Sequence, residues 1–259
     1  MKALILAAGY ATRLYPLTKE TPKPLLKIAG RPIINYLVDK LKDIGGIDKI
    51  FVVTNAKFFS HFRNWAAQAN FKNKLKIIND GTKSEKTRLG AIGDINLAIK
   101  KKRINDDLLV LGGDNLFTGG LGGFIKKALE NKPALTIGLF DINDKKAAAR
   151  YGVAEIDRNK RVVSFKEKPS MPRSTLAAMC LYYLPKEKLG LTNEYLYGNR
   201  NLHRNDATGN YISWLYKKQP IYGFVFRGRW YDIGHVDAYK MADRVFTQAL
   251  KRDRVVMSG

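Results

Sequence analysis

The segment that most constrains the fold is a small-residue turn that directly follows a short apolar run. The run, residues 3–6, has the length and composition of a buried strand. The turn Ala8-Gly9-Tyr10-Ala11 comes next, then Arg13, and later the proline-stiffened loop Pro22-Lys23-Pro24. Small side chains let backbone N–H groups approach a phosphate, while Arg13 and Lys23 supply positive charge. The segment therefore predicts an α/β protein with a phosphate site at the end of its first strand.

Strand and helix signals alternate through the first 140 residues. Apolar runs of strand length are each followed by apolar residues at helical spacing. This alternation is typical of an open, mostly parallel sheet with helices on both faces, in which ligands sit beyond the carboxyl ends of the strands. The expected strands are 3–6, 49–54, 75–78, 107–111 and 134–140, and the expected helices are 31–44, 58–69, 89–99 and 121–129.

The pattern changes after residue 140, where shorter strands are joined by hairpin-like turns. This change predicts a β-rich subregion that completes the first sheet. The expected strands here are 152–156, 161–165, 177–183 and 221–226, followed or interrupted by a helix over 208–217 and a terminal helix that includes 238–249.

Charge and cysteine content narrow the class of protein. Lys and Arg number 46 against 23 acidic residues, which gives a formal net charge of +23, and the single cysteine, Cys180, permits no intrachain disulfide. The basic residues are scattered along the chain, so we expect no specific nucleic-acid partner. We interpret the excess of positive charge as a feature of the source's proteome, and it also attracts anionic ligands. No apolar run approaches membrane-spanning length and no signal peptide is evident. We therefore expect a cytoplasmic protein that does not bind membranes.

The opening segment resembles the signature of the sugar-1-phosphate nucleotidylyltransferases, which usually reads G-G-x-G-T-R-L-x-P-x-T and then P-K-P-L. Ala8 and Ala11 stand where that signature usually has glycine. The resemblance extends over about residues 1–245. The matching residues are Thr12, Arg13, Leu14, Pro16, Thr18, Pro22, Lys23, Pro24 and Leu25.

The resemblance implies an activity and its partners. The expected enzyme transfers a nucleotidyl group from a nucleoside triphosphate to a sugar 1-phosphate and releases pyrophosphate. The favoured substrates are dTTP or UTP and glucose 1-phosphate, and the expected cofactor is Mg²⁺. Relatives are often dimers or tetramers, which leaves a homo-oligomer open.

The resemblance assigns the nucleotide to the first turn and to two later segments. Arg13 and Lys23 are the catalytic candidates: Arg13 would grip the β- and γ-phosphates, and Lys23 would lie between the α-phosphate and the sugar phosphate. The glutamine of many thymidylyl- and uridylyltransferases is not evident, so the base stays open. The nucleotide-binding candidates are Leu6, Ala8, Gly9, Tyr10, Ala11, Thr12, Arg13, Asp80, Leu89 and Gly90.

Two aspartates are the metal candidates. Asp114 follows a buried strand, and Asp232 lies in a Trp-x-Asp-x-Gly segment similar to one in the family. Judged from the residues alone, either carboxylate could serve as a turn or helix cap, although His235 or Asp237 lies closer to the terminal helix. The resemblance implies that both bind the metal, and Mg²⁺ prefers such oxygen ligands.

The sugar phosphate is assigned to the second half of the chain. Glu167-Lys168-Pro169 resembles the family's E-K-P element, whose glutamate accepts hydrogen bonds from sugar hydroxyls and whose lysine meets the phosphate. Tyr151-Gly152 resembles another element that lines the sugar site. The sugar-phosphate candidates are Asn115, Tyr151, Gly152, Glu167, Lys168 and Met179.

We therefore expect one nucleotidyltransferase domain over residues 1–259, with an open, mostly parallel Rossmann-like sheet. Residues 1–140 would form its nucleotide-binding half, 141–235 its sugar-phosphate-binding half, and 236–259 a C-terminal helix and tail. Two other functions stay open. One is a transferase for a non-sugar phosphate such as phosphocholine, and the other is a non-catalytic regulatory protein that binds a nucleotide or a sugar. The first needs an aromatic cage, for which the candidates are Tyr182, Tyr183, Tyr195 and Tyr197.

Overall fold

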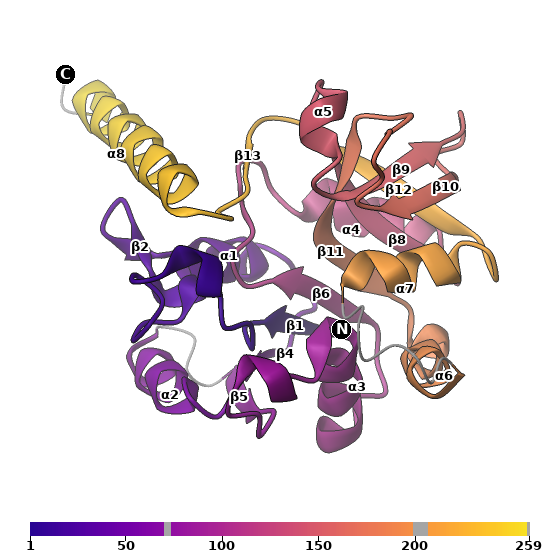
Figure 1. The fold of residues 1–259 in the computed structure, drawn as a ribbon, viewed down its shortest axis with the longest axis horizontal. Coiled ribbons are helices and arrows are strands. Elements are labelled where there is room, and N and C mark those ends of the chain that lie inside the picture. The colour runs from indigo at the N-terminus through magenta and orange to yellow at the C-terminus, as the bar shows by residue number, and fades with distance from the viewer. Residues whose placement is uncertain (70–73, 199–206, 258–259) are drawn as a thin grey trace.

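A central sheet with helices on both sides organises the chain (Figure 1). The computed structural model describes residues 1–69, 74–198 and 207–257. The strands are β1 (Lys2–Leu6), β2 (Lys27–Ile28), β3 (Arg31–Pro32), β4 (Lys49–Thr54), β5 (Leu75–Asn79), β6 (Leu108–Gly112), β7 (Leu116–Phe117), β8 (Leu135–Asp141), β9 (Gly152–Ile156), β10 (Val162–Glu167), β11 (Leu176–Leu184), β12 (Ile221–Phe226) and β13 (Trp230–Tyr231). The α-helices are α1 (Ile33–Lys42), α2 (Phe59–Gln68), α3 (Gly90–Lys102), α4 (Gly122–Glu130), α5 (Lys145–Ala148), α6 (Gly190–Gly198), α7 (Thr208–Leu215) and α8 (Val236–Met257), and the 3₁₀ helices are η1 (Thr12–Leu14), η2 (Lys23–Leu25), η3 (Glu85–Thr87) and η4 (Lys186–Lys188).

The order of strands in the large sheet is β10-β9-β11-β6-β1-β4-β5, and β8 joins β11 to β12. Strands β6, β1, β4 and β5 are parallel, whereas β11 is antiparallel to both β6 and β8. The expected α/β fold with a mostly parallel, Rossmann-like sheet is confirmed. In this register Leu6 lies beside Val53 and Gly112, so the carboxyl ends of β1, β4 and β6 meet at one edge of the sheet.

Two apolar layers cover the two faces of the sheet. Successive strand residues point to opposite faces, so Ala3 and Ile5 belong to one layer and Leu4 belongs to the other. Helices α1, α2 and α4 pack on the first face, and α3, α6 and α7 pack on the second. This arrangement explains why the inner strands are apolar on both sides, as expected of buried parallel strands.

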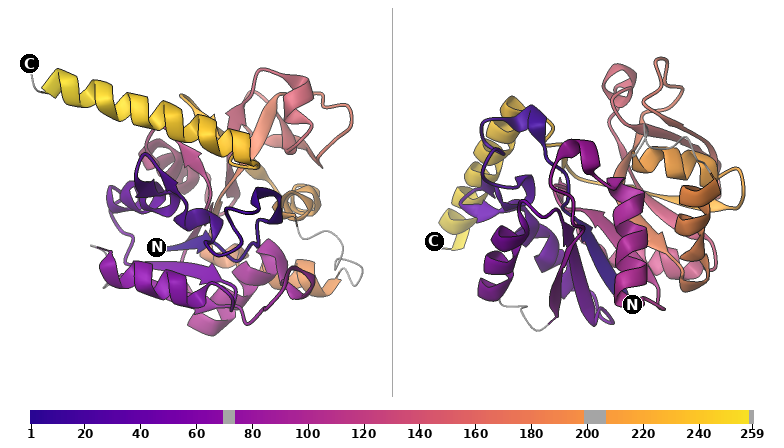
Figure 2. Two further views of the ribbon diagram at one scale, coloured as in Figure 1. Left: turned by 60° about the vertical axis from the view of Figure 1, so that its left-hand side comes forward. Right: turned by 60° about the horizontal axis from the view of Figure 1, so that its bottom comes forward.

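The elements of the second half gather beside those of the first half (Figure 2). Strand β11 joins the two halves by pairing with β6 and β8, and β12 joins them by pairing with β8. The small antiparallel sheet of β7 and β13 makes a further connection. Trp230 lies opposite Phe117 and Tyr231 opposite Leu116 in that small sheet. The chain after β13 therefore returns to the loop that follows β6.

Helix α8 begins beside β2 and projects beyond the rest of the molecule (Figures 1 and 2). The Tyr239 hydroxyl donates to the Lys27 carbonyl at 2.6 Å, and the Ala29 N–H donates to Asp243 at 2.7 Å. Of the two cap candidates, His235 and Asp237, His235 caps the start of the helix, because its Nδ1 accepts the Ala238 N–H at 3.3 Å. In the part of the chain that the structure describes, no helix has the length and apolarity needed to span a bilayer.

Several sequence-based boundaries need correction. The first helix begins at Ile33 rather than at Arg31, because Arg31 and Pro32 are extended and pair with β2. It ends at Lys42, before the glycine pair at 45–46 that was expected to end it. Helix α5 and the two-residue strands were not predicted, since such short elements carry too little periodicity to be recognised. Helix α6 was not predicted either, because it buries only Thr192 and Tyr195 and shows no apolar stripe.

Candidate active site

The turn after β1 is held in place from both sides. The Ala7 N–H donates to the Val53 carbonyl at 2.8 Å, and the Gly113 N–H donates to the Leu6 carbonyl at the same distance. Ala8 accepts a hydrogen bond from the Asn55 side chain at 2.9 Å. The turn that was predicted to bind phosphate is thus fixed to the ends of β4 and β6.

Ala11 has a left-handed backbone conformation, with φ 48° and ψ 42°. This conformation suits glycine, which explains why the related signature carries glycine at this position. The hydroxyl of the fully buried Thr18 donates to the Ala11 carbonyl at 2.7 Å, and the Leu14 N–H donates to the same oxygen at 3.0 Å. These bonds hold alanine in a conformation that its Cβ disfavours.

Arg13 and Lys23 lie on different parts of the following loop. Arg13 belongs to η1, where its side chain is exposed. Lys23 begins η2, and its Nζ lies 2.5 Å from Oδ2 of Asp114. The structure therefore joins the predicted catalytic lysine to a predicted metal ligand.

The ion pair controls the charge of Asp114. Burial acts to raise the pKa of this carboxyl, but the Lys23 ammonium outweighs burial and lowers the pKa below its ordinary value. Asp114 is therefore ionised at neutral pH and can serve as an oxygen ligand for a hard cation.

The second predicted metal ligand comes to the same place through β13. Because Tyr231 lies opposite Leu116, Asp232 and Asp114 leave the same end of the β7–β13 sheet. The Tyr151 hydroxyl donates to Oδ2 of Asp232 at 2.9 Å. Carboxylate oxygens are donors that Mg²⁺ prefers, so the chemistry of both side chains fits the expected ion. Within the described ranges no group of three or more His, Cys, Asp and Glu side chains has a metal-binding arrangement.

Asn115 and Met179 link the segments that surround the two carboxylates. The Asn115 side-chain amide donates to the Met179 carbonyl and its Oδ1 accepts the Trp230 indole N–H at 2.7 Å. Both side chains are buried, with exposed fractions of 5% for Asn115 and 1% for Met179. They fix β7, β11 and β13 together, and neither lines the cavity described next.

A cavity of about 170 Å³ lies close to the two carboxylates. Tyr151, which lines it, donates to Asp232, and Cys180, which also lines it, lies with Asp114 against Gly112. Four predicted sugar-phosphate residues line it: Tyr151, Gly152, Glu167 and Lys168. Burial raises the pKa of Glu167, and the neighbouring Lys168 ammonium partly offsets this effect. The Lys168 N–H donates to the Tyr151 carbonyl at 2.9 Å, which places the two ends of the β9–β10 hairpin side by side.

Other residues of the cavity were not predicted. Cys180, Thr208 and Gly209 line it, and the Tyr182 hydroxyl donates to Thr208 at 2.8 Å. A Cβ on Gly209 would lie 1.8 Å from Oε2 of Glu167, so only glycine leaves room for this carboxylate. Glycine is unfavourable within a helix. A glycine near the start of the expected helix 208–217 was therefore the sequence feature that could have pointed to Gly209.

The four tyrosines proposed for an aromatic cage do not come together. Tyr182 lines the cavity, but Tyr183 is fully buried and donates to Asp107 at 2.5 Å. Tyr195 is buried on α6, and Tyr197, on the same helix, is exposed. The structure therefore contradicts a cage made from these side chains.

The predicted base-binding residues lie at the ends of β5 and α3. Oδ1 of Asp80 accepts the Thr82 N–H at 2.7 Å, and the Tyr10 hydroxyl lies 3.3 Å from the Thr82 hydroxyl. Burial raises the pKa of Asp80 and outweighs the hydrogen bonds from Thr82. Leu89 is exposed, and Gly90 starts α3 with φ 76°. Asp80 and Tyr10 thus join this loop to the phosphate turn, while Leu89 presents an exposed apolar side chain and Gly90 is buried.

Comparisons with known proteins identify the family of the chain. The family model described as Nucleotidyl transferase matches residues 2–249. The chain is similar to two curated proteins described as bifunctional protein GlmU, with 28% identity in Methanocaldococcus jannaschii and 27% in Methanococcus aeolicus, each over 238 residues. Each alignment covers 90% of this chain and 51% of the relative, so the chain spans about half the length of these curated relatives.

Solved structures share the fold. One is a Bacillus anthracis protein in complex with sucrose, assigned as a glucose-1-phosphate thymidylyltransferase, with a TM-score of 0.82, 23% identity and 95% coverage of both chains. Another is a UDP-glucose pyrophosphorylase complexed with UDP-glucose, with a TM-score of 0.78, 20% identity, and coverage of 96% of this chain and 98% of that chain. At these identities the likeness concerns the fold.

Proposed function

This chain belongs to the nucleotidyl transferase family, and on that premise we propose that it transfers a nucleotidyl group from a nucleoside triphosphate to a sugar 1-phosphate, releasing pyrophosphate. The membership confirms the resemblance seen in the sequence and makes the chain an enzyme of the nucleotidyltransferase class. We propose dTTP or UTP and glucose 1-phosphate as the favoured pair. One of the two solved structures is named as a glucose-1-phosphate thymidylyltransferase and the other as a UDP-glucose pyrophosphorylase, and these names support this pair.

One observation carries the proposal: the 2.5 Å contact between Lys23 and Asp114. It joins the lysine of the N-terminal signature to the carboxylate that follows β6, beside a cavity that contains Glu167 and Lys168. A nucleotide on the first turn and a sugar phosphate in the cavity would therefore meet at Lys23.

The reaction needs charge neutralisation more than proton transfer. The attacking oxygen of the sugar phosphate is already anionic at neutral pH, so no general base is required. Arg13 binds the β- and γ-phosphates of the leaving pyrophosphate, and Lys23 neutralises charge between the α-phosphate and the attacking phosphate. Lys168 holds the attacking phosphate in line with the α-phosphorus, and this orientation lowers the barrier further.

Asp114 and Asp232 would hold Mg²⁺, and when bound this ion would polarise the α-phosphate. Glu167 accepts hydrogen bonds from sugar hydroxyls, and these bonds favour its charged form against the effect of burial. Leu89 and Gly90 let the base lie against α3.

A nucleoside triphosphate substrate favours a cytoplasmic location, and a homo-oligomer stays a prediction.

Pyrophosphate release tests the proposal. Each of the common nucleoside triphosphates is combined with glucose 1-phosphate, other sugar 1-phosphates and phosphocholine. We expect release with dTTP or UTP together with glucose 1-phosphate. Release with phosphocholine alone would favour the alternative transferase, and no release with any pair would favour a non-catalytic binding protein.

A further inference from the structure

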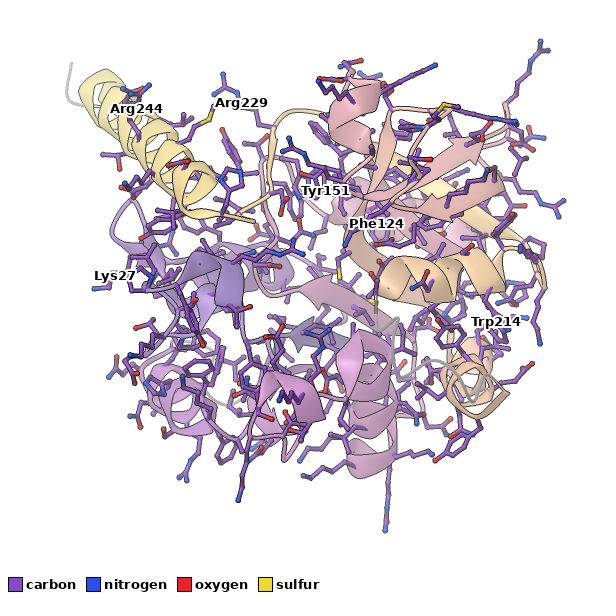
Figure 3. The ribbon with its side chains drawn as sticks, viewed as in Figure 1. Lys27, Phe124, Tyr151, Trp214, Arg229 and Arg244 are labelled. Carbon is purple, nitrogen blue, oxygen red and sulfur yellow. The ribbon has the colours of Figure 1, made fainter. Side chains whose placement is uncertain are left out.

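Tyr151 belongs to two parts of the site at once. Its side chain lines the cavity that also contains Glu167 and Lys168. Its hydroxyl donates to Oδ2 of Asp232 at 2.9 Å. Figure 3 shows Tyr151 between the lobe of β9 and β10 and the segment that leads from β12 through β13 to α8.

The surroundings of Tyr151 hold its ring in a defined place. The ring lies 5.1 Å from that of Trp230, at 52° between the ring planes. Trp230 in turn donates to Asn115, the residue next to Asp114. The tyrosine therefore contacts the strand pair from which both carboxylates emerge.

The other partner of this hydrogen bond is less constrained. Asp232 is exposed and directly follows a strand of two residues, so few packing contacts fix its carboxylate. A tyrosine hydroxyl is protonated at neutral pH, so it donates to the Asp232 carboxylate.

We infer that Tyr151 is a positioning residue that couples occupancy of the cavity to the orientation of Asp232 as a metal ligand. This inference rests on the proposed function, because that function assigns the cavity to the sugar phosphate and Asp232 to the metal. A hydrogen bond to a ligating carboxylate fixes its orientation, and loss of such a partner typically weakens metal binding about 10–100-fold.

The coupling works in both directions. A sugar phosphate that fills the cavity limits the movement of the Tyr151 ring, and the hydroxyl then stays directed at Asp232. The metal therefore binds more tightly when the cavity is occupied. By thermodynamic linkage, the metal increases the affinity for the sugar phosphate by the same factor.

The test measures Mn²⁺ affinity by calorimetry in the absence of a nucleotide, so that no turnover occurs. We compare the wild type, Tyr151→Phe, Asp232→Asn and the double variant, with Tyr197→Phe as the control because Tyr197 is 68% exposed on α6. Tyr151→Phe keeps the ring in the cavity wall and removes only the hydroxyl. We expect a loss of about 10-fold in Mn²⁺ affinity for Tyr151→Phe and none for the control.

The double variant shows whether Tyr151 acts through Asp232. If it does, the double variant binds Mn²⁺ no more weakly than Asp232→Asn alone. Glucose 1-phosphate should also tighten Mn²⁺ binding to the wild type more than inorganic phosphate does. This difference should disappear in Tyr151→Phe, since inorganic phosphate supplies the same oxygens without filling the sugar cavity.

Unchanged Mn²⁺ affinity in Tyr151→Phe, or losses that add in the double variant, would overturn the inference. Pyrophosphate release by the wild type is measured separately. An active wild type with an unaffected Tyr151→Phe rejects the coupling and leaves the function intact, whereas an inactive wild type rejects the function whatever the metal affinities are.

Discussion

Nζ of Lys23 lies 2.5 Å from Oδ2 of Asp114, so a lysine of the N-terminal signature contacts a carboxylate 91 residues further along the chain. The contact is possible because β1 and β6 are neighbours whose carboxyl ends coincide at Leu6 and Gly112. Before substrates arrive, the two residues satisfy each other's charge. The phosphates of the substrates would offer Lys23 a new partner, and a cation would offer one to Asp114. The ion pair is therefore the state of the site before substrates bind.

The pair should make stability depend on pH. Lys23 lowers the pKa of Asp114, so the stabilisation is fully present above the carboxyl's unfolded pKa of about 4 and is lost as the pH falls through the lower folded value. In Lys23→Gln, both the charge and the hydrogen bond of the lysine are lost, so the pKa of Asp114 should rise. The variant's deficit in the free energy of unfolding should therefore grow from about pH 3 to pH 7.

Urea denaturation at a series of pH values measures this deficit. Lys127→Gln is the control, because it breaks a half-exposed ion pair with Glu130 on α4 and should cost less than about 1 kcal/mol. A deficit for Lys23→Gln that stays constant with pH would show that the lysine does not control the charge of Asp114.

Ala11 should be a site where glycine is tolerated better than in ordinary helix or turn positions. The left-handed conformation costs an alanine about 1–2 kcal/mol, and glycine avoids this cost while losing about 0.5–1 kcal/mol through the flexibility of the unfolded chain. We expect Ala11→Gly to leave the free energy of unfolding unchanged or to raise it by up to about 1.5 kcal/mol.

The matched variant is Ala8→Gly, in the same turn. Ala8 is buried and is not among the residues with positive φ, so its replacement should destabilise the protein by about 0.5–1 kcal/mol or more. Equal destabilisation by the two glycines, seen in denaturant titrations, would mean that Ala11 stores no backbone strain.

Gly209 should be needed for the cavity. A Cβ at this position would lie 1.8 Å from Oε2 of Glu167, so Gly209→Ala must displace the carboxylate that is proposed to bind sugar hydroxyls. We expect KM for the sugar 1-phosphate to rise by about 10-fold or more, as when a charged hydrogen bond is lost, with little change in KM for the nucleotide.

Gly190→Ala is the control, since no atom lies within 4 Å of a Cβ built on Gly190 at the start of α6. It should leave both KM values unchanged. A rise in the nucleotide KM equal to that in the sugar KM for Gly209→Ala would point to a general disturbance of the fold instead of a local effect on Glu167.

The sequence predicted those parts of the molecule that depend on regular strands and on local motifs. The convergence of Lys23 with Asp114 followed from the rule that carboxyl ends of parallel strands share an edge, and Glu167 ends β10 at the cavity with Lys168 directly after it. The contact of Tyr151 with Asp232 could not be predicted in this way. It depends on the pairing of β7 with β13, two strands too short to show periodicity.

Pyrophosphate release by Lys23→Ala tests the central claim most directly. The measurement uses the nucleotide and sugar 1-phosphate on which the wild type is most active, with Lys76→Ala, an exposed lysine on β5, as the control. Loss of a preorganised positive charge at the reacting phosphates should lower turnover by about 10²-fold or more, while the control stays at the wild-type rate. Turnover near the wild-type rate in Lys23→Ala would contradict the account, because it would remove the residue on which the two halves of the site meet.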